Sequence, residues 1–272
     1  MYNAFFGFNE SPFNLSPDPQ FLYRSPQHEE ALANLIYGVE ERKGFIVLTG
    51  EVGTGKTTML TCLRDDLQER GIAYAFLCNT RLTADQFYEM ISEDLGLNCQ
   101  AGSKTQVLIA LTRMLNQQVS RGSTTALIVD EAHDLSWDLL EEIRLLGNLE
   151  DRTGKLLQIV LAGQPELDNR LEAPNLRQLK QRIVLRFALS AFSQAETVEY
   201  IRTRLARAGL EEQTIFSPDV LAEIHRRTQG IPRVVNIMCD NLLLTAFAME
   251  HKAVNVEMLD EVTADMRLAW PT

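Results

Sequence analysis

The stretch Gly50-Glu51-Val52-Gly53-Thr54-Gly55-Lys56-Thr57 restricts what this chain can fold into more than any other feature. It matches the pattern GxxxxGK[ST] of a phosphate-binding loop. A continuous apolar run, Phe45 to Thr49, precedes it, and an amphipathic stretch to Arg70 follows it. The apolar run is typical of a buried parallel strand, and the amphipathic stretch predicts a helix. The sequence therefore predicts strand, loop and helix in succession, the setting in which such a loop binds phosphate.

The residues of this loop have distinct predicted roles. Its glycines let the backbone wrap a phosphate without Cβ clashes, and the backbone N–H groups and the helix N-terminus point at the anion. We expect Lys56 to reach the β- and γ-phosphates, Thr57 to hold Mg²⁺, and Thr58 to assist near the α-phosphate. The candidate nucleotide-binding residues here are Gly50, Glu51, Val52, Gly53, Thr54, Gly55, Lys56, Thr57 and Thr58.

A second apolar run, Thr125 to Val129, ends in the acids Asp130 and Glu131. Ligands of open parallel sheets bind at the carboxyl ends of the strands. We expect Asp130 to hold Mg²⁺ through its water shell and Glu131 to polarise the attacking water. With Ala132 and His133 the acids spell DEAH, a box of RNA helicases, but only helices follow where a helicase needs a second sheet domain. His133 either orients the catalytic acid or simply packs.

Three further polar residues lie at predicted element ends. Gln164, which closes the apolar run Leu156 to Ala162, could position the water beside the γ-phosphate, or it could mark a strand-to-helix turn only. Arg182 precedes a predicted fifth strand and could serve as an arginine finger toward a neighbouring subunit, with Arg177 and Arg186 as competitors. Arg233, in Gly230-Ile231-Pro232-Arg233 at a helix start, could read the γ-phosphate from a mobile lid.

The rest of the chain alternates predicted strands and helices up to about Ser190 and then carries helical patterns only. This order predicts an α/β fold, a P-loop domain with a five-stranded parallel sheet and helices on both faces, followed by a small all-helical lid. We predict an aromatic and proline-rich arm with a helix over residues 1–40, a nucleotide-binding domain over 41–190 and the lid over 191–272. Because the arm is rich in aromatic residues, we expect it to pack across the domain that follows, or on a neighbouring subunit.

The composition of the chain limits which partners and which location we expect. The formal net charge of −11 argues against broad binding to nucleic acid or anionic lipid, although Arg177 to Arg186 and Arg202 to Arg207 form local basic clusters. The four cysteines show no metal-ligand spacing, which fits a reducing cytosol. No apolar stretch reaches the 18 or more residues that span a bilayer. We therefore expect a soluble, cytoplasmic chain, peripheral to the inner membrane at most.

The order of these motifs resembles the AAA+ ATPases. More narrowly, the chain is similar to the general secretion pathway protein A (ExeA/GspA) type and is related to TniB/TnsC-like ATPases. The stretches that carry this resemblance are Tyr2, Phe6-Gly7-Phe8, Pro12-Phe13, Pro17-Asp18-Pro19, Tyr23, His28 to Leu32, Leu161 to Leu167 and Gln181-Arg182-Ile183. The resemblance implies ATP rather than GTP, with Mg²⁺, and an ATP-dependent homo-oligomer.

Three functions are compatible with these patterns. The first is an ATP-hydrolysing protein that drives assembly or regulation of a bacterial envelope secretion or export system, type II secretion-like or exopolysaccharide, through a protein partner. The second is a DNA-associated, ATP-dependent regulator of transposition that forms rings or filaments; nucleic acid is the less favoured partner because of the net charge. The third is a nucleotide-gated binding module without turnover, which the intact Asp130-Glu131 pair disfavours.

Overall fold

The computed structural model describes residues 1–15, 21, 23–97, 103–210 and 215–269. The predicted Pro17-Asp18-Pro19 motif lies outside these residues. By their internal packing the described residues divide into two compact units. The first consists of residues 1–25, 53–58 and 190–272, and the second of residues 26–52 and 59–189. The domain boundaries at 40 and 190 stay a prediction.

The second unit is built on a five-stranded sheet with the order β2-β3-β6-β1-β7, in which all paired strands run parallel. Its strands are β1 (Phe45–Gly50), β2 (Ala73–Leu77), β3 (Thr125–Val129), β6 (Gln158–Gly163) and β7 (Ile183–Leu189). Every residue of β1, β3 and β6 is buried, as expected of strands covered on both faces. The predicted five-stranded parallel sheet is confirmed.

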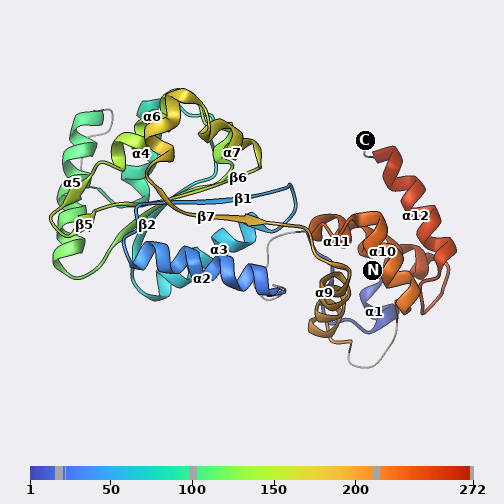
Figure 1. The fold of residues 1–272 in the computed structure, drawn as a ribbon. Coiled ribbons are helices and arrows are strands. Elements are labelled where there is room, and N and C mark those ends of the chain that lie inside the picture. Colours follow the sequence, from blue (N-terminus) through green and yellow to red (C-terminus); the bar gives the residue numbers. More distant parts are fainter. Residues whose placement is uncertain (16–20, 22, 98–102, 211–214, 270–272) are drawn as a thin grey trace. The chain divides into compact units, whose positions relative to one another are not determined.

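Helices cover both faces of this sheet, with α2 and α3 on one side and α4, α6 and α7 on the other (Figure 1). The helices that begin between residues 26 and 189 are α2 (Pro26–Glu40), α3 (Lys56–Glu69), α4 (Ala84–Asp94), α5 (Lys104–Ser120), α6 (Trp137–Leu146), α7 (Glu166–Leu171) and α8 (Arg177–Lys180). Thr83 caps α4 in a reciprocal capping box with Gln86.

A short hairpin lies between α6 and β6. Helix α6 ends at Leu146 and is followed by β4 (Glu150–Asp151) and β5 (Gly154–Lys155), which pair antiparallel. Gly147 follows α6 against the ring of Phe45, where an added Cβ would lie 2.2 Å from a ring carbon. Packing of this ring therefore requires glycine just past the helix.

The first unit has a helical core of its own. Its helices are α1 (Asn3–Phe6), α9 (Gln194–Arg207), α10 (Pro218–Thr228), α11 (Pro232–Ala248) and α12 (Val256–Ala269). The arm aromatics Tyr2, Phe6, Phe8, Phe13 and Phe21 are buried in one cluster with residues of α9 to α12. The prediction that the arm packs across the nucleotide-binding domain is therefore wrong, because the rings complete the core of the helical unit.

Buried polar contacts fix the arm in this core. Arg204 of α9 is 6% exposed and donates to Pro12 O at 2.5 Å, to Tyr200 Oη at 2.8 Å and to Asn14 O at 3.2 Å. The Tyr2 hydroxyl donates to Asp240 of α11, and burial together with this bond raises the pKa of Tyr2. One planar guanidinium thus binds two arm carbonyls that no smaller donor reaches together.

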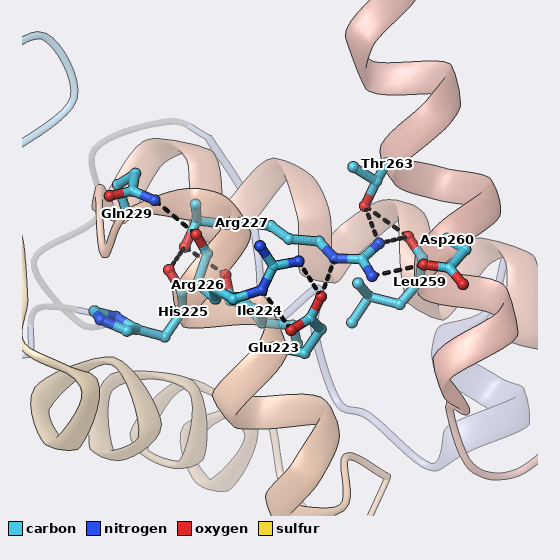
Figure 2. A network of polar contacts seen from close by, with 10 residues as sticks. Glu223, Ile224, His225, Arg226, Arg227, Gln229, Leu259, Asp260 and Thr263 are labelled. Carbon is cyan, nitrogen blue, oxygen red and sulfur yellow. Dashed lines mark hydrogen bonds and ion pairs between the residues drawn. The ribbon is translucent and has the colours of Figure 1, made fainter.

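A charged network joins α10 to α12 (Figure 2). Glu223 accepts from Arg226 and Arg227, and these bonds lower the pKa of Glu223 to about 2. Arg227 also donates to Leu259 O at 2.8 Å, Thr263 Oγ1 at 2.7 Å and Asp260 Oδ1 at 2.6 Å.

The described residues contain no helix with the length and apolar character that crossing a membrane requires.

Candidate functional site

The glycine-rich loop begins where the buried strand β1 ends at Gly50 and closes where α3 begins at Lys56. Gly53 and Gly55 have φ values of +81° and +103°, in the region that favours glycine. The Lys56 side chain is buried, at 6% exposure, and Thr54 is fully buried. Since the first N–H groups of α3 have no carbonyl acceptors within the helix, the start of this helix is suited to an anion.

Asp130 directly follows β3 and is 4% exposed. Its backbone N–H donates to Leu77 O at 2.8 Å, which extends the pairing of β2 with β3, and its Oδ1 accepts the N–H of Glu131 at 2.9 Å. A carboxylate oxygen is a hard donor of the kind that Mg²⁺ prefers. Among the described residues, no three or more His, Cys, Asp or Glu side chains form a group that could hold a metal ion.

Glu131 has a left-handed backbone, with φ 50° and ψ 36°. This conformation costs a residue with a Cβ roughly 1–2 kcal/mol, and such strain concentrates at functional sites. The conformation starts the short turn η2 (Ala132–Asp134), which turns the chain away from β3. The Glu131 carboxylate lies 3.3 Å from His133, measured from Oε2 to Nδ1. The structure thus holds the predicted catalytic acid in a conformation that the sequence did not indicate.

Gln164 follows β6, the strand that lies between β3 and β1. Its backbone N–H points at His133 Nδ1 over 3.4 Å. The preceding Gly163 lies against η2, and an added Cβ there would come within 3.1 Å of the backbone nitrogen of His133. Glu131, His133 and Gln164 therefore meet at one corner of the sheet edge.

The three candidate finger arginines have different surroundings. Arg182 lies just before β7 and donates to Arg144 O at 3.2 Å. Arg186 is on β7 and pairs with Asp168 of α7 at 3.2 Å, whereas Arg177 is exposed. Asp168 also accepts the Thr49 hydroxyl at 2.9 Å, so Arg186 is held within its own chain. The assignment of Arg182 as the finger stays a prediction.

Arg233 is the second residue of α11 and its side chain is exposed. Its N–H donates to Gly53 O at 3.2 Å, and an added Cβ on Gly53 would lie 2.7 Å from the Cβ of Arg233. Lys56, Thr57, Thr58 and Arg233 belong to the first unit, and Asp130, Glu131, Gln164 and Arg182 belong to the second. The structure therefore describes the predicted site as two separate sets of residues.

Arg170 is a supporting residue that sequence reasoning missed. It donates to the carbonyls of His133 and Leu135, and its guanidinium lies 4.8 Å from the ring of Trp137. Burial lowers the pKa of Arg170. No motif marks this residue, because the carbonyls that it binds lie more than thirty positions away in the sequence.

Comparisons with known proteins agree with this geometry. A protein-family model described as an AAA domain matches residues 39–171. General secretion pathway protein A of Aeromonas hydrophila is 45% identical over 258 residues, which cover 94% of this chain and 47% of that protein. The chain is an AAA+ protein of the general secretion pathway protein A type. It spans about half the length of this curated relative.

Solved structures share the fold of this AAA+ protein. Cdc6p from Pyrobaculum aerophilum has a TM-score of 0.73 at 20% identity, over 94% of this chain and 71% of that one. The Aeropyrum pernix ORC2 protein, in ADPNP–ADP complexes, has a TM-score of 0.67 at 15% identity, over 95% and 72%. The Thermotoga maritima RuvB branch migration motor has a TM-score of 0.58 at 15% identity, over 87% and 68%. At these identities the likeness shows the fold alone.

Proposed function

We propose that this chain binds ATP with Mg²⁺ and hydrolyses it as a homo-oligomer, and that this cycle drives assembly or regulation of a bacterial envelope export system. The observation that carries the proposal is Glu131. Its strained backbone follows the buried Asp130, which is the residue just after β3; β3 lies one strand away from β6 and two from the strand that leads into the phosphate-binding loop. A binding module without turnover has no need for a strained carboxylate at this edge.

The residues divide the chemistry among them. The loop Gly50 to Thr57 binds the phosphates, and Lys56 places its charge among their oxygens. Thr57 and Asp130 would hold Mg²⁺, which when bound supplies charge neutralisation at the transferring phosphoryl group. Glu131 polarises the water, Gln164 positions it, and Arg233 senses the γ-phosphate. The expected division of residues 1–40, 41–190 and 191–272 into arm, nucleotide-binding domain and lid forms part of the proposal.

The export role rests on the curated relative, whose name places it in a general secretion pathway. Because this chain spans about half of that protein, the pathway and the protein partner are proposals for the present chain. The alternative role on DNA has no comparable support. The structural likeness to DNA-bound ORC proteins is at 22% identity or less, and the net charge is −11.

Phosphate release by purified protein tests hydrolysis. We expect Lys56→Ala to abolish turnover and nucleotide binding, and Glu131→Gln to lower kcat by roughly 10²–10⁴-fold while ATP still binds. Glu89→Gln, an exposed carboxylate on α4, is the matched control and should retain wild-type turnover. Unchanged turnover in Glu131→Gln would refute the catalytic assignment.

A mixing experiment tests the finger and the oligomer together. A Lys56→Ala subunit still supplies Arg182, and an Arg182→Ala subunit still supplies an intact phosphate loop. If the arginine acts across a subunit boundary, two inactive variants regain part of the activity when mixed, and wild-type specific activity rises with protein concentration. Activity that stays absent in the mixture would assign Arg182 to its own chain, where it already contacts Arg144.

A further inference from the structure

The turn that carries His133 is fixed through its backbone. Arg170 donates to the carbonyls of His133 and Leu135, and the backbone of the turn lies against Gly163 at the end of β6. The His133 side chain is only 10% exposed. The backbone of this turn is therefore held by contacts that do not involve the ring, and we expect a change of the ring to leave the turn in place.

Two groups compete for one nitrogen of this ring. His133 Nδ1 lies 3.3 Å from Glu131 Oε2 and 3.4 Å from the backbone nitrogen of Gln164. The carboxylate needs an N–H at Nδ1, whereas the Gln164 N–H needs a lone pair there, and one nitrogen cannot offer both. The other ring nitrogen, Nε2, lies 3.8 Å from Asp134, whose side chain is 59% exposed.

The carboxylate of Glu131 depends on this nitrogen. Its Oε2 is buried and has no hydrogen-bond partner among the residues that the structure describes, apart from the ion-pair contact with the imidazole. A ring protonated at Nδ1 donates to Glu131 and leaves the Gln164 N–H without this acceptor. A ring protonated at Nε2 accepts from Gln164 and leaves Glu131 without this donor. The tautomer therefore decides which of the two neighbours the ring holds.

We propose that His133 is the positioning residue for Glu131 and that it links the orientation of this carboxylate to the end of β6 at Gln164. This inference rests on the proposed hydrolysis of ATP. When Gln164 moves away from Nδ1, the ring donates to Glu131 and fixes the carboxylate in its working direction. A catalytic group that loses its orientation reacts more slowly although the nucleotide binds as before.

Two amide variants with a matched design test the role of Nδ1. The amide of His133→Asn reaches the place of Nδ1, whereas the longer His133→Gln places its amide near Nε2; His133→Leu removes both. We expect His133→Gln and His133→Leu to lower kcat by roughly 10-fold or more, with the KM for ATP within about 2-fold of wild type. The kcat of His133→Asn should stay within about 3-fold of wild type. His251→Asn, an exposed histidine in the first unit, is the control. Equal losses in Asn and Leu, or a change in KM alone, would overturn the proposal.

A readout without turnover separates this inference from the proposed function. Nitrogen-15 NMR of the imidazoles in nucleotide-free protein distinguishes the two tautomers, with the His133 signals assigned by their loss in His133→Asn. We expect Glu131→Ala to shift His133 toward the form protonated at Nε2, because the acceptor at Nδ1 has gone. An unchanged tautomer would overturn the inference even in a protein that hydrolyses ATP, and the shift would support it in a protein that does not.

Discussion

Replacement of Gly53 by alanine tests how the phosphate-binding loop packs against α11. Gly53 has a φ of +81°, and an added Cβ would lie 2.7 Å from Arg233 Cβ and 3.2 Å from Ile231 Cγ2. Both atoms lie close to the backbone of the α11 start, so neither can swing away as the tip of a long side chain does. The new methyl group must therefore either displace the helix start or separate it from the loop.

The size of the effect follows from two contributions. A left-handed backbone costs alanine roughly 1–2 kcal/mol, which the reduced entropy of the unfolded chain offsets by about 0.4–1 kcal/mol. Overpacking adds about 1–3 kcal/mol. The overpacking cost has an upper limit, because the loop can instead move away from the start of α11. That separation breaks the hydrogen bond from Arg233 N–H to Gly53 O, which is worth about 1 kcal/mol, among other contacts. We expect Gly53→Ala to lower the unfolding free energy of the first unit by about 2–4 kcal/mol.

Gly7→Ala isolates the backbone contribution. Gly7 belongs to the same unit and has a φ of +83°, but an added Cβ there would meet nothing within 4 Å. Gly7→Ala should therefore lower the unfolding free energy by about 1 kcal/mol or less. Hydrogen exchange of the Arg233 amide provides the local measurement, because this N–H lies in the first turn of α11 and donates to Gly53 O. Equal costs for the two variants, together with unchanged exchange at Arg233, would refute the argument.

Three further perturbations test contacts that support the two units. The Glu223 carboxylate, whose pKa falls from 4.5 to about 2 on folding, stabilises the protein above pH 4.5 and loses this effect as the pH falls toward 2. The gap in melting temperature between wild type and Glu223→Gln should therefore close over that range, and a constant gap would contradict the linkage. Arg204→Lys should lower the unfolding free energy in urea by about 2–4 kcal/mol. The three N–H donors of an ammonium group share one nitrogen, whereas the three acceptors of Arg204 are served by three different nitrogens of its fork. A cost below about 0.5 kcal/mol would contradict this argument. A double-mutant cycle of Asp168→Ala with Thr49→Val should give a coupling of about 1 kcal/mol, and additive losses would show that their 2.9 Å bond contributes nothing.

Local patterns carried most of the fold prediction. The runs that became β1 and β3 are apolar throughout because both faces of each strand are covered, and this property can be read from the residues themselves. The strand order could not be read in this way, since it depends on pairings between segments far apart in the sequence. The two-residue strands β4 and β5 are too short to show any periodicity, so the sequence pattern does not reveal them.

The arm shows a different limit. Its aromatic composition correctly indicated burial, but composition does not say in which core. The choice is made by Arg204 and Asp240, which lie about two hundred residues further along the chain and bind Pro12 O and the Tyr2 hydroxyl. At the candidate functional site, too, contacts between distant segments could not be read from the sequence. Asp130 and Glu131 could be found by motif, whereas the contacts of His133 with Gln164 and Arg170 depend on how β6 and α7 lie beside β3.

The two sets of site residues are supported by different frameworks, and this has a consequence for kinetics. The pairing of β3 with β6 and the Arg170 clamp fix Glu131, His133 and Gln164, whereas the loop from Gly53 to Thr58 packs in one unit with the start of α11. A change in the first framework alters the orientation of the carboxylate, and a change in the second alters the loop that binds phosphate. Variants of His133 and Arg170 should therefore act mainly on kcat, and variants of Gly53 mainly on nucleotide affinity. A His133 variant that weakens nucleotide binding as much as Gly53→Ala would show that the two frameworks are not independent.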